Sequence, residues 1–230
     1  MKKSQIDGIR FYYRENTSDL KTFEEVIKRD VYQKKGMKIL PDEDWYDCGG
    51  NVGAFTLLAC SKKANVTVFE PDPFNCKQIE KNLKLNNFDA RIVNAALVHD
   101  NTQKANLYVG NNGNVWRNSM YKNWNGKGIK VKCVNFDEYV PDNACVKIDI
   151  EGAEMPILEN TKRKFNKLVF EWSFDIDPSL PRFWNIIDKI KNDYKVSSIS
   201  NTARYETRDY NVWQKSWFPA CTNVFAYGKN

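Results

Sequence analysis

The chain has 230 residues, of which 42% are hydrophobic and 28% are charged, and its formal net charge is +6. This composition predicts a globular protein with a continuous core, and it excludes a disordered chain or a small fold that depends on disulfides or structural metals. No apolar run approaches the roughly 20 residues that cross a bilayer, and the polar start Met1-Lys2-Lys3 is unlike a signal peptide, so we expect a cytoplasmic protein without a membrane span.

The cysteine pattern indicates the redox state of the thiols, and the distribution of positive charge indicates which partners are favoured. Six cysteines are scattered along the chain without a C-x-x-C pair, which favours reduced thiols that pack as small hydrophobic side chains. The lysines are spread along the chain rather than gathered in one block, and no recognised nucleic-acid-binding module accompanies them. We therefore interpret the charge as a solvated basic surface, and nucleic acid as an unfavoured partner.

The first 43 residues differ in pattern from the rest of the chain. Apolar residues at Phe23, Val26, Ile27 and Val31 recur at helical spacing and predict a helix over residues 20–34. We interpret residues 1–43 as an N-terminal helical appendage, followed by a main domain over residues 44–230.

From residue 44 onward, short β-rich runs alternate with helical stretches. The predicted strands are 45–48, 65–70, 90–94, 144–150 and 167–172, with helices at 54–62, 74–86 and 180–192 and further strands at 195–200 and 223–227. Strand alternating with helix predicts an α/β fold with a parallel sheet. The first five strands end in Asp, Asn or Glu or are followed by them, and ligands of such sheets bind beyond the carboxyl ends of the strands.

About fifty residues separate the third and fourth predicted strands. They contain two further β-rich runs, at 106–109 and 129–134, and a Gly/Asn-rich aromatic stretch at 110–128. Loops of this length in a compact domain are often lids or binding segments. We expect an insertion with two extra strands and an irregular, functional loop.

The strongest single motif follows the first predicted strand of the main domain and precedes a helix. It reads Asp47-Cys48-Gly49-Gly50-Asn51-Val52-Gly53. Glycines allow a tight turn and close approach of a ligand to the main chain, and the amides at a helix start favour polar or anionic groups. The alternative is an ordinary strand-to-helix turn.

Glu70 ends the next strand, about twenty residues after the glycine loop. An acidic side chain at this place can accept hydrogen bonds from both hydroxyls of a ribose, as in dinucleotide-binding folds. The loop lacks G-x-G-x-x-G and opens with Asp47, which can accept a hydrogen bond from an ammonium group. An amino-acid-bearing nucleoside therefore fits better than the pyrophosphate of NAD.

The fourth strand releases two carboxylates and a glycine before a helix, in Asp149-Ile150-Glu151-Gly152. Asp149 and Glu151 can act as proton acceptors or as ligands of a hard cation. Glu154 has a simpler explanation, because the helix dipole favours an acidic residue in the first turn.

Four segments in this order resemble the FkbM family of methyltransferases. They are Asp-x-Gly-x-Asn-x-Gly at 47–53, Glu-Pro-x-Pro at 70–73, Asn-Ala-Ala-Leu at 94–97 and Lys-Ile-Asp-Ile-Glu-Gly-Ala-Glu at 147–154. Residues 134–139 also resemble the short helix before the family's fourth strand. The resemblance covers roughly residues 44–228 and leaves out the N-terminal segment.

The resemblance implies a Rossmann-like class I methyltransferase fold, with a mostly parallel seven-stranded sheet, helices on both faces and an insertion between the third and fourth core strands. It implies methyl transfer from S-adenosylmethionine to oxygen, commonly a hydroxyl of a sugar or polyketide-like product. Asp47, Gly49, Asn51 and Gly53 would hold the methionine end of the cofactor, Glu70 the ribose, and Asp72 with Asn94, Ala95 and Ala96 would lie near the adenine, with Pro71 as a further cofactor-binding residue. Asp149, Glu151 and Glu171 would form the active site.

Methyl transfer to a hydroxyl requires alignment of the acceptor and removal of a proton. The only histidine, His99, lies in a predicted surface turn. Asp149, Glu151 or Glu171 is then the expected base, and a Mg²⁺ or Mn²⁺ ion bound by Asp149 and Glu151 is an alternative means of activating the acceptor.

Acceptor recognition is predicted to come from the insertion, where aromatic faces and hydrogen-bond donors suit a sugar ring. The candidates are Trp116, Arg117, Asn118, Ser119, Tyr121 and Trp124. The alternative is that the aromatic residues only pack the loop onto the domain.

Three other functions share parts of this pattern. A nucleic-acid or protein N-methyltransferase would be expected to carry an Asn/Asp-Pro-Pro-Tyr/Phe loop after the fourth strand, where this chain has Asp149-Ile150-Glu151-Gly152. A noncatalytic carbohydrate-binding domain would have no need of the glycine loop and Glu70. A nicotinamide oxidoreductase is the third alternative.

Overall fold

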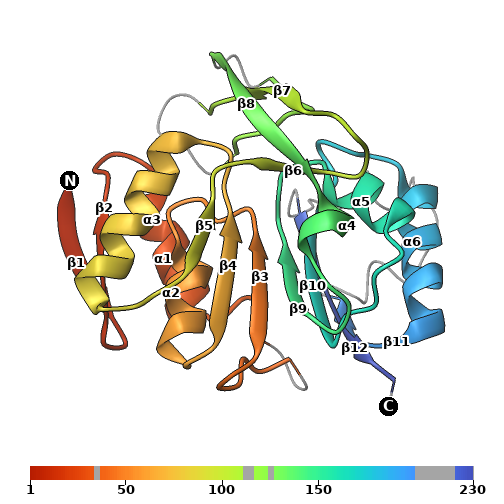
Figure 1. Cartoon of the computed structure of the whole chain (residues 1–230), viewed down its shortest axis with the longest axis horizontal. Coiled ribbons are helices and arrows are strands. Elements are labelled where there is room, and N and C mark those ends of the chain that lie inside the picture. The colour runs from red at the N-terminus through yellow and green to blue at the C-terminus, as the bar shows by residue number, and fades with distance from the viewer. Residues whose placement is uncertain (34–36, 111–116, 124–126, 200–220, 230) are drawn as a thin grey trace, which may run out of the picture.

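The computed structural model describes residues 1–33, 37–110, 117–123, 127–199 and 221–229. Its centre is a seven-stranded sheet in the order β11-β12-β10-β9-β3-β4-β5 (Figure 1). Only β12 runs antiparallel to its neighbours, and the other neighbouring pairs are parallel. The predicted α/β fold with a mostly parallel seven-stranded sheet is therefore confirmed.

The strands and helices predicted from residue 44 onward are present, with bounds shifted by at most two residues. The sheet strands are β3 (Asp44–Cys48), β4 (Asn65–Phe69), β5 (Arg91–Val93), β9 (Cys145–Ile148), β10 (Lys167–Ser173), β11 (Tyr194–Ile199) and β12 (Cys221–Gly228). The connecting helices are α2 (Ala54–Ser61), α3 (Pro73–Asn86), α4 (Phe136–Tyr139), α5 (Glu154–Asn160) and α6 (Leu180–Asp193).

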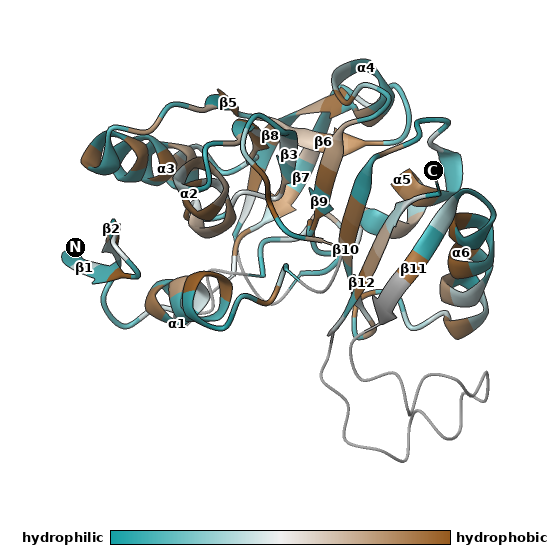
Figure 2. Ribbon diagram, turned by 90° about the horizontal axis from the view of Figure 1, so that it is seen from below, coloured by the Kyte–Doolittle hydropathy of each residue, from teal (hydrophilic) through white to brown (hydrophobic). Residues whose placement is uncertain are grey.

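Helices cover both faces of the sheet, with α2 and α3 on one side and α5 and α6 on the other (Figure 2). Successive strand residues point to opposite faces. On β10, Leu168 and Phe170 pack in the core under α5 and α6, whereas Val169 packs in the core under α2 and α3. Burial on both faces explains why these strands are continuous apolar runs rather than alternating ones.

The insertion between β5 and β9 forms a three-stranded sheet of its own. Its strands are β6 (Ala96–Val98), β7 (Lys104–Tyr108) and β8 (Gly128–Asn135), in the order β6-β8-β7. The two predicted strands correspond to β7 and β8, and β6 was not predicted as a strand. His99 follows β6 and is exposed, as expected of a surface turn residue.

The N-terminal segment contains a hairpin that was not predicted from the sequence. Strands β1 (Lys2–Ile6) and β2 (Ile9–Tyr13) pair in antiparallel register, and helical residues α1 (Asp19–Phe23) and η1 (Glu24–Lys28) follow. The predicted helix over 20–34 thus ends at Lys28, because Asp30 adopts a positive φ of 54° that no helix continues through. A domain boundary at residue 43 stays a prediction.

The N-terminal segment shares a core with the sheet. Phe11, Phe23 and Ile27 belong to the same buried cluster as Trp45 and Phe55. Within the described residues, no helix is both long and apolar enough to cross a membrane.

Candidate active site

A pocket opens at the carboxyl ends of β3, β4 and β9. It contains about 600 Å³ of space outside the protein atoms, part of which is open to solvent. Loops after these strands meet there because parallel strands end at the same edge of the sheet. The lining residues are Gly49, Asn51, Phe69, Glu70, Pro71, Asn75, Ala95, Ala96, Leu97, Leu107, Asn118, Met120, Asp149, Ile150 and Glu151.

The glycine loop after β3 is packed against the loop after β9. A Cβ on Gly49 would lie 1.8 Å from the backbone oxygen of Asp149, and the φ of Gly49 is +93°. No other residue fits that position without moving the backbone. The amides of Gly49 and Gly50 both donate to the backbone oxygen of Phe69, at 3.0 and 2.9 Å, which fixes the loop to the end of β4.

Glu70 is one of the acidic residues that line this pocket and is 4% exposed. Its carboxylate accepts hydrogen bonds from the backbone N–H of Asn51 at 2.6 Å and of Asp72 at 2.9 Å. Burial raises the pKa of Glu70 to about 8, against the opposing effect of these hydrogen bonds. The side chain thus combines a fixed position with a protonation state that changes near neutral pH.

The floor beyond Glu70 is formed by the loop after β5. Ala95 and Ala96 line the pocket, and the Asn94 side-chain amide donates to the backbone oxygens of Glu70 and Pro71 at 2.9 and 3.0 Å. Asp72 caps α3 by accepting from the N–H of Phe74 at 2.8 Å. Asn94 and Asp72 therefore shape this end of the pocket without lining it.

Asp47 lies beneath the glycine loop, fully buried, and does not line the pocket. One of its oxygens accepts from the Thr56 hydroxyl at 2.7 Å, and the other lies 3.1 Å from the Lys147 ammonium. Gly53, at φ +89°, packs against Ile79. Both residues support the loop from below.

Lys147 is a buried cation at the centre of these contacts, a role that was not predicted from the sequence. Besides Asp47, its ammonium donates to the backbone oxygen of Gly49 at 2.7 Å and lies 3.8 Å from Asp149. Burial acts to lower the pKa of Lys147, but the carboxylates of Asp47 and Asp149 outweigh burial and raise it. A lysine inside an apolar strand ending in Asp was the signal in the sequence.

Asp149, Glu151 and Glu171 come together at the edge of the pocket. Each offers an oxygen, and these oxygens lie within 4.8 Å of one another. Burial, then the charges of Asp149 and Glu171, raise the pKa of Glu151 well above its usual value. Glu151 also has a φ of 53°, a backbone conformation that ordinary residues rarely adopt and that often marks a functional site.

Glu154 holds the backbone of this acidic loop. Its two carboxylate oxygens accept from the N–H groups of Ile150 at 2.6 Å and of Gly152 at 2.7 Å. Burial raises the pKa of Glu154 to about 7. Its role is thus more specific than a general match to the helix dipole.

Tyr32, from the N-terminal segment, also reaches the acidic cluster. Its hydroxyl donates to Asp149 at 2.6 Å, and its ring lies 5.4 Å from the Lys147 ammonium. Burial, followed by the charge of Asp149, raises the pKa of Tyr32 well above its usual value. This contact joins residues 117 positions apart, so no local sequence pattern could indicate it.

The insertion reaches the pocket through its described residues 117–123. Asn118 lines the pocket, and its amide donates to Asp72 at 3.4 Å. Ser119 is buried and donates to the backbone oxygen of Glu151 at 2.6 Å, so it anchors the insertion to the acidic loop. Arg117 pairs with Asp175. Trp116 and Trp124 lie outside the described residues.

The pocket suits S-adenosylmethionine by the chemistry of its lining. Glu70 offers acceptors for ribose hydroxyls, apolar Ala95 and Leu97 suit a flat base, and the glycine loop leaves the backbone open to a ligand. The side-chain oxygens of Asn51 and Asn75 are buried without a hydrogen-bond partner in the protein. Buried unpaired acceptors are costly unless a ligand donor satisfies them.

Comparison with solved structures supports the fold. The Pyrococcus abyssi tRNA (uracil-54, C5)-methyltransferase in complex with S-adenosyl-L-homocysteine is 15% identical, with a TM-score of 0.52 over 98% of this chain and 43% of that chain. The present chain therefore spans less than half the length of that enzyme. The fibrillarin/Nop5p complex structure gives 13% identity and a TM-score of 0.50 over 99% of this chain and 97% of that chain. At these identities the likeness shows a Rossmann-like class I fold.

Comparison of the sequence with models of protein families identifies the family of this chain. A search of curated proteins gave no significant match. The sequence model of the methyltransferase FkbM domain matches residues 47–196, which is most of the chain and includes the glycine loop, Glu70 and the acidic loop after β9. The chain therefore belongs to the FkbM family of S-adenosylmethionine-dependent methyltransferases.

Proposed function

We propose that this methyltransferase acts on oxygen, at a hydroxyl of a sugar in a glycan or a glycosylated small molecule. The observation that carries the proposal is the carboxylate cluster of Asp149, Glu151 and Glu171 beside the cofactor pocket. An alcohol needs a proton acceptor when it is methylated, and no histidine lies in the site, because the only one, His99, is exposed after β6.

The cofactor is proposed to lie along the carboxyl ends of β3, β4 and β5. Glu70 accepts from the ribose, Pro71, Ala95 and Ala96 surround the adenine, and Gly49 with Asn51 bounds the methionine end. Asp47, Gly53, Asp72 and Asn94 support these groups through the contacts described above. When bound, the sulfonium supplies an activated methyl group.

The acidic cluster then accepts the proton of the acceptor hydroxyl. The acceptor hydroxyl forms a bond to the methyl carbon as the sulfur–carbon bond breaks, and its proton passes to a carboxylate. Glu151 is best suited as that base, because burial and two like charges raise its pKa and so strengthen its hold on a proton. Asp149 and Glu171 orient it or the acceptor.

The three carboxylates also provide a donor set that fits Mg²⁺ or Mn²⁺, which prefer oxygen ligands. Such an ion would lower the pKa of the acceptor hydroxyl. Asp149, Glu151 and Glu171 would hold it, and the base would then be a carboxylate that is not fully engaged by the ion.

Arg117, Asn118 and Ser119 support a polar acceptor near the cluster. Asn118 lines the pocket, and Ser119 ties the insertion to Glu151. Arg117, paired with Asp175, lies on the same side. Trp116 and Trp124 remain candidates for stacking on a sugar ring, from their position in the sequence alone.

The test is transfer of labelled methyl groups from S-adenosylmethionine to a panel of acceptors, namely deoxysugar glycans, bulk tRNA and ribosomal RNA, and a protein mixture, each with Mg²⁺ and with a chelator. We expect label in the glycan fraction and loss of turnover in Glu151→Gln. Label in RNA or protein would overturn the sugar acceptor. Glycan binding without any turnover would favour a noncatalytic carbohydrate-binding domain.

A further inference from the structure

The N-terminal hairpin is docked on α3 by a ladder of side-chain amides. Asn86 exchanges two hydrogen bonds with the backbone of Arg10, at 2.9 and 2.6 Å. One turn earlier, Asn82 accepts from the N–H of Tyr12 at 2.7 Å, and Gln78 donates to the oxygen of Tyr12 at 2.7 Å. These amides at four-residue spacing pair with the free edge of β2 as a neighbouring strand would.

The ladder also contacts the glycine loop, because Asn82 donates to the backbone oxygen of Val52 at 3.2 Å. The hairpin, α3 and the glycine loop are thus held together by polar contacts. The position of the chain after β2 is fixed relative to the cofactor pocket.

Arg14 lies two residues after Tyr12 and also contacts α3. Its guanidinium lies 5.4 Å from the ring centre of Phe74, in the first turn of α3. Its Nε and Nη2 donate to Asp19 at 2.8 and 2.7 Å, and Asp19 is 1% exposed. This two-point contact fixes the plane of the guanidinium.

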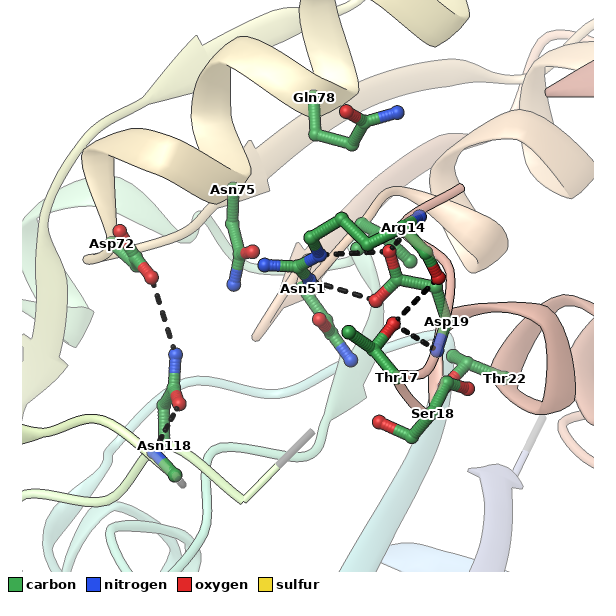
Figure 3. A network of polar contacts seen from close by, with 12 residues as sticks. Arg14, Thr17, Ser18, Asp19, Thr22, Asn51, Asp72, Asn75, Gln78 and Asn118 are labelled. Atoms are coloured by element: carbon green, nitrogen blue, oxygen red, sulfur yellow. Dashed lines mark hydrogen bonds and ion pairs between the residues drawn. The ribbon is translucent and has the colours of Figure 1, made fainter. Parts of the chain in front are cut away.

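Buried polar atoms without hydrogen-bond partners lie near this guanidinium and on the segment that carries it. They are the side-chain oxygens of Asn51, Asn75 and Ser18. In Figure 3 the Arg14 side chain extends from the N-terminal segment toward Asn75 and Asn51, with Ser18 and Thr17 on the same segment below it. Asn51 and Asn75 both line the pocket.

We propose that Arg14 binds the carboxylate of the cofactor's methionine portion, with Ser18 as a second hydrogen-bond donor and Asn51 as an acceptor for the neighbouring ammonium. The N-terminal segment, outside the residues 47–196 that match the family, then completes the cofactor site. The proposal rests on the cofactor site described under the proposed function.

The charges at this place fit a zwitterion. A carboxylate requires donors, and Arg14 has only donors, one nitrogen of which is not used by Asp19. The ammonium requires acceptors, which the unpaired oxygen of Asn51 provides. Because Asp19 balances the charge of Arg14, the guanidinium supplies hydrogen bonds without adding a net positive charge near the cationic sulfonium.

The experiment compares two ligands that differ in one group on the sulfur. S-adenosylhomocysteine carries an amino-acid side with an ammonium and a carboxylate, and 5′-methylthioadenosine carries a methyl group in its place. Binding of S-adenosylhomocysteine and of 5′-methylthioadenosine is measured by calorimetry for the wild type and for Arg14→Gln. Loss of a charge-assisted hydrogen bond predicts that the first affinity falls on the order of ten- to hundredfold while the second stays within about twofold. Arg10→Gln, on the same hairpin but with only backbone contacts to α3, is the matched control and should leave both affinities unchanged.

Comparing the two ligands keeps the test independent of folding, since a collapsed pocket loses both. The double variant Arg14→Gln/Asp19→Asn removes the buried unpaired charge and should show the same selective loss. An unchanged ratio of the two affinities in these variants would overturn the role of Arg14 alone. A wild type that binds neither compound would overturn the cofactor site, and the role of Arg14 with it.

Discussion

The Tyr32 hydroxyl donates a hydrogen bond of 2.6 Å to Asp149, so the N-terminal segment reaches into the acidic cluster. Tyr32 is buried against Phe55 and lies over the Lys147 ammonium. Asp149 in turn follows β9, which pairs with β3, the strand that leads into the glycine loop. The segment before residue 44 therefore contributes to two parts of the site, through Tyr32 at the proposed reacting centre and through Arg14 at the proposed cofactor end.

Tyr32→Phe is expected to lower kcat by about tenfold while the affinity for S-adenosylhomocysteine changes little. The substitution keeps the ring and removes one hydrogen bond to a charged group, which holds Asp149 in place. Steady-state kinetics and calorimetry on the same preparation provide the measurement.

Tyr46→Phe is a suitable control for Tyr32→Phe, because Tyr46 packs against the core on β3 and is not part of the site. Its kcat should match the wild type. A Tyr32→Phe variant with normal kcat would show that the hydroxyl does not position the reacting groups.

The buried pair of Lys147 and Asp47 predicts a large effect on stability. Lys147→Met leaves the carboxylate of Asp47 buried without its cation, which typically costs about 3–5 kcal/mol of unfolding free energy. The double variant Asp47→Asn/Lys147→Met should recover much of this loss, because an Asn oxygen still accepts from Thr56. Denaturant unfolding at neutral pH measures both.

Lys164→Met is the matched control for Lys147→Met. Lys164 pairs with Asp193 at 2.9 Å, but the two side chains are 68% and 47% exposed. An exposed pair of this kind contributes less than about 1 kcal/mol. Equal losses of stability in the two lysine variants would contradict a special role for the buried pair.

Hydrophobic pattern and strand-end residues were sufficient to predict the sheet and its helices. The runs around Val146, Val68 and Phe170 are apolar on both faces, and each precedes or contains an acidic residue, so both the fold and the ligand edge follow from local sequence. The glycine loop also indicated where the pocket lies, because its glycines form a recognisable motif in residues 47–53. Gly49 is needed there because its backbone lies against that of Asp149.

Contacts between distant segments could not be predicted in the same way. The pairing of Asp47 with Lys147 joins two strands through side chains, and the sequence favoured Asp47 as an acceptor for the cofactor instead. The hairpin β1–β2 is short, and its first strand is mostly polar. It is stabilised by the Asn82 and Asn86 amides of a helix about seventy residues away, and no local periodicity indicates these contacts. Tyr32 and Arg14 were missed for the same reason.

The acidic cluster predicts a stabilising effect of divalent cations. The pKa of Glu151 is raised in the folded state, so the stability gained from its bound proton is complete below its unfolded pKa and is lost as the pH rises through the folded value. A divalent cation would replace the proton in offsetting the repulsion from Asp149 and Glu171. Mg²⁺ or Mn²⁺ is therefore expected to raise the Tm more at about pH 9 than at about pH 6.

Glu151→Gln should remove most of the cation effect, since it leaves two carboxylates in the cluster. Thermal unfolding with added Mg²⁺ or with a chelator, at both pH values, gives the comparison. A Tm that is insensitive to both ions at either pH would contradict a metal site, and the cluster would then act as a base alone.

Glu70 predicts that cofactor affinity increases with pH near neutrality. Burial raises its pKa to about 8, and ribose hydroxyls bind best to the ionised carboxylate, which has only acceptors. Below that pKa, binding must first remove a proton, so the affinity for S-adenosylhomocysteine should fall by up to about tenfold per pH unit. Calorimetry between about pH 6 and pH 9 measures the slope, and the neutral Glu70→Gln variant corrects for titration of the ligand itself. We expect weak, nearly pH-independent binding in Glu70→Gln; an equal slope in both proteins would place the titrating group elsewhere.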